Sequence, residues 1–478
     1  MEDGVLSPPL RRFLVWMARN GIQYSDALRF GMDGVVSGAG VRALRDLHHG
    51  ELIATIPKAA CLTLLTTAAR DAIARARLGG GLGLTVAVMY ERSKGKGSKW
   101  YRYLKTLPCQ ESVPFLWSEE EIDGLLLGTE LHKALKEDKL LMKEDWEENI
   151  APLTKEDPLE FPAQDFTFES YLAAKSLVSS RSFEIDAEHG YGMVPLADLF
   201  NHKTDAEDVH FMLNASDSDD DDDNNGLIID DGLANGDCRE ISSDKSVLEM
   251  VMVKDVAAGS EIFNTYGQLG NAALLHRYGF TEPNNPHDIV NLDMDCLLEV
   301  LLSRFQKKRV RKRGRVWRKA GFSGCESQGS EYFEISAAGK PQIELLLLLF
   351  VIQSPARDCE ALEDAAAKVK GRVKKAAKAL GWRKETHWGP HPTKKPRLES
   401  VESRLERWLL NSTVIDLLLL VIGKRDELYG ITFGKEERAL GECRQHTKEL
   451  HAARLRIGER RILRDCKQEL LNMKAKQC

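Results

Sequence analysis

Hydrophobic and polar positions follow two alternating patterns along the chain. Between residues 64 and 178, and again after residue 291, apolar residues recur mainly at helical spacing, which predicts two long helical regions. Elsewhere the chain has short, glycine-punctuated, β-branched segments that predict strands. These segments are Val35–Pro57, Val194–Leu199, Val247–Val253 and Glu261–Tyr266. The order of these helical and strand-like segments along the chain predicts two β-rich pieces around a helical insert, followed by a helical C-terminal part.

Several individual helices are expected within this plan. Amphipathic patterns predict a helix over Pro8–Asn20 and longer ones over Glu119–Leu141, Ser403–Ile422 and Glu436–Met473. The longest apolar runs, Ile343–Ile352 and Val414–Ile422, are much shorter than the ~20 residues that cross a bilayer. These two runs are therefore predicted to be buried helices, and no membrane partner is expected.

The composition is that of a soluble globular protein with two to four domains: 478 residues, 43% hydrophobic and 29% charged. A net charge of −6 argues against polyanion binding by the molecule as a whole. The nine cysteines are scattered without a C-x-x-C pair, which predicts free thiols in a reducing compartment and no metal site. The N-terminus lacks the apolar region of a secretory signal.

Charge is distributed unevenly, however. An acidic, Gly/Asn/Asp-rich stretch at 214–246 cannot bury a core and is predicted to be a disordered loop. Two basic segments, Lys307–Lys319 and Pro392–Arg397, lie in the C-terminal part. For the first, three interpretations compete: a solvated helix face, a nuclear-import signal and a nucleic-acid patch. Two such segments together favour the nucleus, whereas direct nucleic-acid binding stays open.

Polar residues end two of the predicted strands abruptly. The segments Val194–His202 and Glu261–Gly267 are apolar until they reach a group of polar side chains, namely Asp198, Asn201, His202, Asn264 and Tyr266. Buried polar groups are costly unless they bond each other or a ligand. The spacing alone leaves two interpretations open, a pair of strand-end turns and a ligand site.

Four motifs occur in an order that resembles a known family. They are SGAGVRALRDLHHGELIATIP, SLVSSRSF, VPLADLFNH and EIFNTYGQLGNAALLHRYGF, and Leu84–Pro108 resembles a segment of that family's insert. The chain thus resembles the SET-domain methyltransferases related to the Rubisco large-subunit methyltransferase, and FNTYGQ with LLHRYGF is most similar to a nuclear lysine methyltransferase subgroup. The acidic stretch departs from that pattern as an insertion, and the cysteine-rich zinc element of many histone methyltransferases is absent.

The resemblance implies an α+β fold, in which a small-sheet SET domain is split by a helical insert and followed by an all-α domain. The implied boundaries are 1–63 for the N-terminal helix and first SET part, 64–180 for the insert, 181–290 for the second SET part, and 291–478 for a substrate-binding domain. The implied activity is methyl transfer from S-adenosyl-L-methionine, without a metal, to a lysine of a protein substrate. A chromatin or transcription-factor protein is the expected partner.

The resemblance also implies roles for individual residues. The residues expected to contact the cofactor are Ser37, Gly38, Ala39, Arg181, Asn201, His202 and Tyr266. Those expected to contact the target lysine segment are Trp100, Ser182 and Glu184. Tyr266 is the expected catalytic residue, whereas Asp198 is expected to brace the Asn201–His202 turn. Three alternatives remain: a histidine methyltransferase of the same fold, a SET-fold binding module without catalysis, and a nucleic-acid-binding protein led by the basic segments.

Overall fold

The computed structural model describes residues 8–34, 38–212, 246–319, 332–355, 406–430, 433–443 and 447–477. The chain divides into two compact units, each described by itself below. Unit 1 comprises Met1–Leu116, Asp138–Gln268 and Arg277–Gly279, and unit 2 comprises Trp117–Glu137, Leu269–His276 and Phe280–Cys478. The acidic stretch predicted to be a loop lies outside the described residues except for Ser246.

Unit 1 is built on small sheets. The largest has four antiparallel strands in the order β1 (Gln23–Tyr24), β4 (Leu52–Pro57), β9 (Val247–Met252) and β8 (Val209–Met212). Side chains on β9 alternate strictly, with Leu248, Met250 and Met252 buried, because successive residues of a strand face opposite sides. The hairpins β2 (Leu28–Gly34)–β3 (Gly38–Ala43) and β5 (Ser182–Asp186)–β6 (Gly190–Met193) lie beside it.

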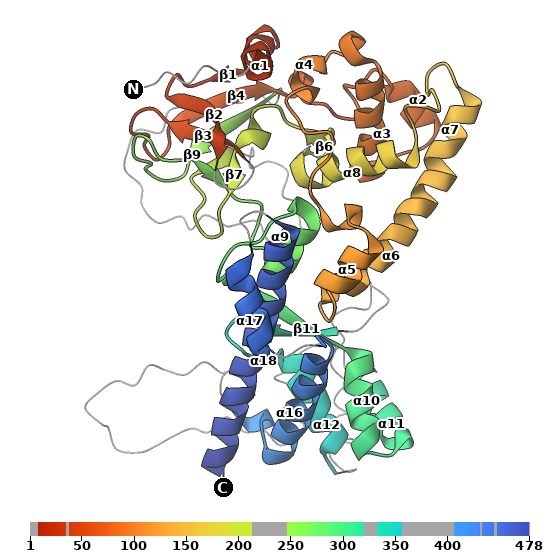
Figure 1. The fold of residues 1–478 in the computed structure, drawn as a ribbon, viewed down its shortest axis with the longest axis vertical. Helices are drawn as coiled ribbons and strands as arrows, with labels where there is room; N and C mark the ends of the chain where they lie inside the picture. The colour runs from red at the N-terminus through yellow and green to blue at the C-terminus, as the bar shows by residue number, and fades with distance from the viewer. Residues whose placement is uncertain are drawn as a thin grey trace. The chain divides into compact units, whose positions relative to one another are not determined.

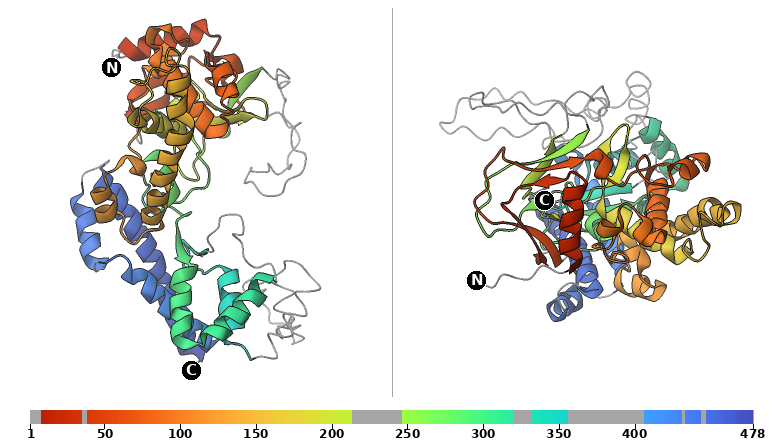
Figure 2. Two further views of the ribbon diagram at one scale, coloured as in Figure 1. Left: turned by 90° about the vertical axis from the view of Figure 1, so that its right-hand side faces the viewer. Right: turned by 90° about the horizontal axis from the view of Figure 1, so that it is seen from above.

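Helices form the rest of unit 1. They are α1 (Pro8–Arg19), α2 (Arg70–Arg75), α3 (Gly80–Ser93), α4 (Tyr101–Leu104), α7 (Ala151–Glu156) and α8 (Phe168–Arg181). Residues Gly83–Glu91 of α3 are all buried, as expected of a helix surrounded by its own domain, and α3 packs against α8. Within unit 1 the strands gather on one side and the insert helices on the other (Figure 1; seen from above in Figure 2).

Unit 2 is mainly helical. It contains one antiparallel hairpin, β11 (Ile289–Asp293)–β12 (Tyr332–Ser336), and α5 (Glu119–Leu125). The helix α6 (Glu130–Asp145) begins in this unit and ends in unit 1, and α9 (Asn271–Tyr278) does likewise. The other helices among the described residues of this unit are α10 (Met294–Arg304), α11 (Lys307–Lys319), α12 (Ile343–Gln353), α16 (Ser412–Glu427), α17 (Phe433–Glu442) and α18 (Lys448–Gln477). Apolar residues of α10, α11, α12, α16 and α18 form one core, with the Leu345–Leu349 run of α12 fully enclosed.

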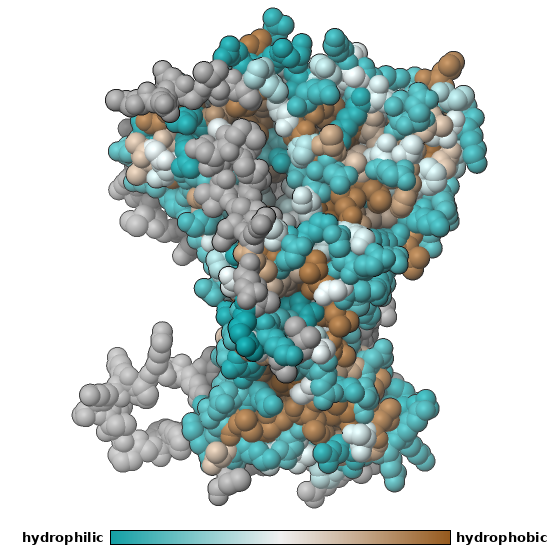
Figure 3. All heavy atoms as spheres, viewed as in Figure 1, coloured by the Kyte–Doolittle hydropathy of each residue, from teal (hydrophilic) through white to brown (hydrophobic). Residues whose placement is uncertain are grey.

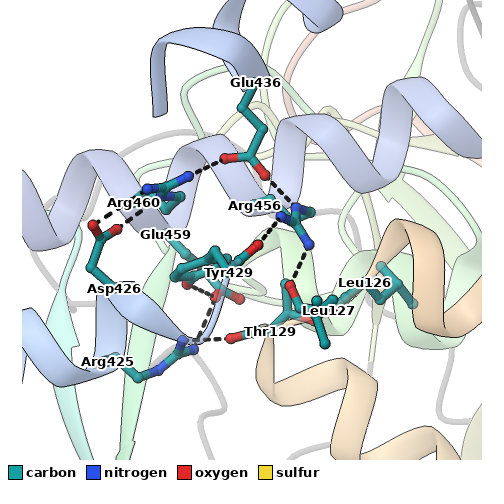
Figure 4. A network of polar contacts seen from close by, with 11 residues as sticks. Leu126, Leu127, Thr129, Arg425, Asp426, Tyr429, Glu436, Arg456, Glu459 and Arg460 are labelled. Atoms are coloured by element: carbon teal, nitrogen blue, oxygen red, sulfur yellow. Dashed lines mark hydrogen bonds and ion pairs between the residues drawn. The ribbon is translucent and has the colours of Figure 1, made fainter. Parts of the chain in front are cut away.

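A buried polar network holds a loop of unit 2 against its C-terminal helices (Figure 4). Arg425 donates to the carbonyl oxygen of Gly128 at 2.5 Å and pairs with Glu459 at 3.2 Å. Arg456 donates to the carbonyl oxygen of Tyr429 at 2.8 Å. Gly128 has φ +86°, and a Cβ there would lie 2.7 Å from the Tyr429 backbone. Only glycine fits this turn without strain.

Four element predictions were wrong in detail. The expected helix Ser403–Ile422 is interrupted at Leu410 and Asn411, so that α16 begins only at Ser412. The expected helix Glu119–Leu141 is divided into α5 and α6 by the turn at Gly128. The expected helix Glu436–Met473 is likewise two helices, α17 and α18. The expected strand Val194–Leu199 is a turn of 3₁₀ helix, Ala197–Leu199, preceded by Leu196 at φ +82°. Apolar composition alone does not separate a buried turn from a buried strand.

Within the described part of the chain, no helix combines the length and the apolar character that a membrane crossing needs.

Candidate active site

The two polar strand ends meet in unit 1. The strand β7 (Asn201–His202) pairs in parallel with β10 (Phe263–Asn264), so that Asn201 lies opposite Phe263 and His202 opposite Asn264. Both strands are only two residues long, and β7 is fully buried. The pairing brings together two segments about 60 residues apart in sequence. The prediction that these polar ends share one site is consistent with this register.

Asn201 is fixed by a buried carboxylate. Its side-chain amide donates to Glu261 Oε1 at 2.7 Å, and both residues are buried. Glu261 lies two residues before β10, so this bond joins the two strand ends a second time. A hydrogen bond to a charged group in a dry environment is stronger than one in water. The backbone of β7 is thereby held rigidly at the site.

His202 and two tyrosines form a stack of rings. The ring of Tyr266 lies 5.0 Å from that of His202 and 4.5 Å from that of Tyr278, with interplanar angles of 24° and 28°. The backbone N–H of Tyr266 donates to His202 Nδ1 at 3.0 Å. A neutral imidazole that accepts at Nδ1 carries its proton on Nε2, which lies 3.1 Å from Thr204 Oγ1. His202 therefore orients the Tyr266 backbone and supports its ring.

The Tyr266 hydroxyl donates to the carbonyl oxygen of Phe200 at 3.2 Å. Burial raises the pKa of Tyr266 well above its usual value, so the side chain stays a neutral phenol at physiological pH. A phenol that donates its proton to a carbonyl still has lone pairs on its oxygen. Tyr266 can therefore accept a hydrogen bond from a group that approaches it.

A buried charged cluster braces the turn that precedes β7. Arg181, at the end of α8, donates to the Asp198 carbonyl oxygen at 3.0 Å and to Glu111 Oε1 at 2.5 Å. The Tyr103 hydroxyl donates to Asp198 Oδ2 at 2.7 Å. Burial raises the pKa of Asp198 to about 6, although Arg181 and the Tyr103 hydroxyl oppose the rise. Arg181 and Tyr103 thus hold Asp198 in the turn before β7, and its expected bracing of the Asn201–His202 turn stays a prediction.

Backbone strain marks the same turn. Leu196 has φ +82° and is fully buried, a conformation that side chains other than glycine rarely adopt. Such a residue costs roughly 1–3 kcal/mol and persists only where the surrounding structure enforces it. The bonds of Arg181 and Tyr103 to Asp198, two residues later, supply that enforcement.

Comparison with known proteins identifies the domain that contains this site. The family described as "SET domain" matches residues 38–267. Over these residues the chain is similar to SET domains. N-lysine methyltransferase setd6 of Xenopus tropicalis is 28% identical over 311 residues, 61% of this chain and 62% of that protein. Ribosomal lysine N-methyltransferase 3 of Saccharomyces cerevisiae is 27% identical over 359 residues, 60% and 65% of the two chains. The matched part thus spans less than two thirds of these curated relatives.

Solved structures extend the similarity of fold beyond the SET domain. The Rubisco large-subunit methyltransferase bound to S-adenosylmethionine superposes with a TM-score of 0.65 at 19% identity, covering 98% of this chain and 93% of that one. Its SET-domain structure with lysine and S-adenosylhomocysteine gives 0.66 at 20%, covering 99% and 93%. The predicted α+β fold, a SET domain with a helical insert and a helical C-terminal part, is confirmed.

The structure places the other predicted site residues as follows. Ser37 lies outside the described residues, while Gly38 and Ala39 begin β3, where Gly38 pairs with Gly34. Ser182 and Glu184 lie on β5, and the Glu184 side chain is exposed. Their roles stay predictions.

Trp100 is buried, whereas a residue that contacts the substrate directly is expected to be accessible. It is 1% exposed, and its indole N–H donates to the carbonyl oxygen of Ala60 at 3.1 Å. The structure therefore gives Trp100 a packing role between the insert and the first SET segment, and a contact with the substrate stays a prediction.

Tyr103 and Glu111 belong to the site but were not predicted from the sequence. Both are in or next to the insert segment Leu84–Pro108 that carries part of the resemblance, yet their partners, Asp198 for Tyr103 and Arg181 for Glu111, lie 95 and 70 residues further along the chain. A single sequence has no periodic signal for such a long-range pair.

Proposed function

We propose that this protein transfers a methyl group from S-adenosyl-L-methionine to the side-chain amine of a lysine in a protein substrate. The observation that carries the proposal is the Tyr266 hydroxyl, held on the Phe200 carbonyl in a stack of three rings at the junction of β7 and β10. The lysine methyltransferases among its relatives, and the related structure that holds lysine and S-adenosylhomocysteine, support the same activity.

The side chains at the site suit a sulfonium cofactor. Ring faces of tyrosine attract cations, and the carboxylates of Asp198 and Glu261 are buried in the same unit. Residues expected to hold the cofactor are His202 and Asn201, through the rigid β7 backbone, with Gly38 and Ala39 in the β3 turn. When bound, S-adenosyl-L-methionine supplies an activated methyl group. Among the described residues no cluster of metal-ligating side chains occurs, and the proposed reaction uses none.

The protein's task is to deliver a neutral amine in the right direction. A lysine of pKa ~10.4 requires about 4 kcal/mol to deprotonate near pH 7.4, and an apolar channel lowers that cost by desolvating the cation. The Tyr266 oxygen, whose proton is committed to Phe200, accepts a hydrogen bond from the amine. That bond turns the nitrogen lone pair towards the methyl group. Catalysis then rests on orientation and electrostatics without a covalent enzyme intermediate.

The full chain, incubated with radiolabelled cofactor and cell extract, tests the proposal. Mass spectrometry of the labelled peptide should find methyl-lysine, whereas methyl-histidine would favour the alternative acceptor. Absence of both label transfer and cofactor binding would favour a binding module.

Substitution of the central tyrosine tests the mechanism. Tyr266→Phe keeps the ring stack and should lower turnover at least tenfold, about 1.4 kcal/mol of barrier, while cofactor affinity by calorimetry changes little. Tyr278→Phe removes a hydroxyl from the neighbouring ring of the same stack and is the matched control. Equal turnover in Tyr266→Phe and wild type would refute the assigned role.

The substrate and cell compartment are narrower proposals. A nuclear location is supported by the basic segments Lys307–Lys319 and Pro392–Arg397, the latter outside the described residues. A chromatin or transcription-factor protein is the corresponding substrate. A tagged chain with both segments neutralised should lose nuclear signal, and unchanged signal would contradict the location.

A further inference from the structure

The helix α11 has two chemically different faces. Apart from Val310, Gly314, Val316 and Trp317, every residue of Lys307–Lys319 is lysine or arginine. The sequence alone suggested a segment too basic to be buried. In the structure, however, Trp317 is 1% exposed and Arg313 is 8% exposed.

The buried face is fixed by arginines that cap another helix. Arg309 donates from Nε to the carbonyl oxygen of Ile352 at 3.0 Å and from Nη2 to that of Gln353 at 2.7 Å. Arg313 donates from Nη1 to the carbonyl oxygen of Ile352 at 2.6 Å. These carbonyls end α12, where they lack helical partners and carry partial negative charge. Together with buried Trp317, the two arginines set the rotation of α11 about its axis.

The opposite face presents only cations to solvent. Lys308, Arg311, Lys312 and Arg315 are exposed, and their spacing of three, four and seven residues places them along one stripe. No carboxylate among the described residues lies within salt-bridge distance of any of the four. Like charges at these spacings repel one another. The margin of unit 2 where Figure 1 shows α11 is hydrophilic in Figure 3.

We propose that this stripe binds the phosphate backbone of a nucleic acid, a function separate from methyl transfer. Lysine and arginine neutralise phosphates and release condensed counterions, whatever the base sequence. Protein interfaces, in contrast, have aromatic and apolar anchors and are depleted in lysine. Helices that lie on membranes insert an apolar face, whereas the apolar side chains of α11 are buried in the core of unit 2. The stripe itself contains no apolar side chain.

Fluorescence anisotropy with a labelled DNA duplex of mixed sequence tests the proposal on the full chain. The test variant carries Lys308→Gln, Arg311→Gln, Lys312→Gln and Arg315→Gln together. The matched control also loses four charges, from exposed cations on other elements, through Arg11→Gln, Arg12→Gln, Arg75→Gln and Lys96→Gln. Circular dichroism and methyl-transfer activity verify that both variants are folded, since neither set belongs to the proposed active site.

The test variant should bind the duplex at least tenfold more weakly than wild type and the control. The slope of log affinity against log salt should also become shallower by about 3.6, because each of the four phosphates that the variant no longer neutralises changes the slope by about 0.9. Equal affinity and slope in the test variant and the control would overturn the proposal. So would tighter binding to an Asp/Glu-rich peptide, or to phosphatidylserine vesicles, than to the duplex, because the stripe would then serve a protein or a membrane.

Discussion

Removal of the buried carboxylate at Asp198 should change how the protein's stability depends on pH. The pKa of Asp198 in the folded protein is about 6, against an ordinary value of 3.8, and burial is the main cause. The native state therefore holds a proton more tightly than the unfolded chain does. This contribution to stability is complete below pH 3.8 and is lost as pH rises to about 6. The rise of the pKa by about two units, at 1.36 kcal/mol per unit, corresponds to about 3 kcal/mol of folding stability.

Asp198→Asn removes this titration and keeps an oxygen that can accept the Tyr103 hydroxyl. The free energy of unfolding, measured by urea at constant ionic strength, is compared between variant and wild type from pH 4 to pH 8. The difference, variant minus wild type, should rise by roughly 2.4 kcal/mol between pH 4 and pH 8, because other titrating groups cancel and a part of the effect is already lost at pH 4. A difference that is constant, or that falls with pH, would refute the assignment of a raised pKa.

A second variant tests the Tyr103 hydroxyl, which opposes the rise in the pKa of Asp198. The Tyr103 hydroxyl, 2.7 Å from Asp198 Oδ2, stabilises the charged form. Tyr103→Phe should therefore raise the pKa of Asp198 further and move the stability transition to higher pH. Tyr101→Phe, on the same short helix α4, is the matched control and should leave the transition where it is.

Two further substitutions test the site and the fold. Asn201→Ala removes the 2.7 Å bond to Glu261 that holds β7, and S-adenosyl-L-methionine affinity by calorimetry should fall at least tenfold, about 1.4 kcal/mol; unchanged affinity would count against its role. Gly128→Ala places a Cβ 2.7 Å from the Tyr429 backbone at φ +86°, and should lower the free energy of unfolding by more than about 1 kcal/mol. Gly124→Ala is the control, because its added Cβ meets nothing within 4 Å, and it should leave the free energy of unfolding unchanged. An equal loss of stability in both variants would contradict the close approach of Gly128 to the Tyr429 backbone.

The polar strand ends were predictable because their signal is local. In each of the two segments an apolar run stops at polar side chains, and the family resemblance supplied their partners. The structure then pairs Asn201 with Phe263 in register. The turn at Leu196 was not predictable, because nothing in an apolar sequence shows that leucine will adopt φ +82°. Its cause is tertiary and lies in the bonds made by Arg181 and Tyr103.

In the basic segment Lys307–Lys319, too, the role of individual residues depends on tertiary contacts that the sequence does not show. A solvated helix face was one of the three interpretations of Lys307–Lys319, and the exposed stripe of α11 agrees with it. The buried arginines differ from the exposed ones only in position, since Arg309 and Arg313 lie on the side of α11 that meets the end of α12. Residue type alone does not separate an arginine that caps a helix from one that binds a partner. The rotation of α11 about its axis, which Trp317 and the two capping arginines set, decides which arginines are buried and which are exposed.

Perturbed acids alone would not have located the active site. Burial also raises the pKa of Glu459 in unit 2 to about 7, against the opposing effects of Arg425 and the Tyr429 hydroxyl. Its arrangement parallels that of Asp198, yet its partners join α16 and α18 to the loop at Gly128 (Figure 4). Structural ion networks perturb pKa values as active sites do. What distinguishes Asp198 is its position, because the turn that it braces leads directly into β7 and the ring stack, whereas the Glu459 network ends within packed helices.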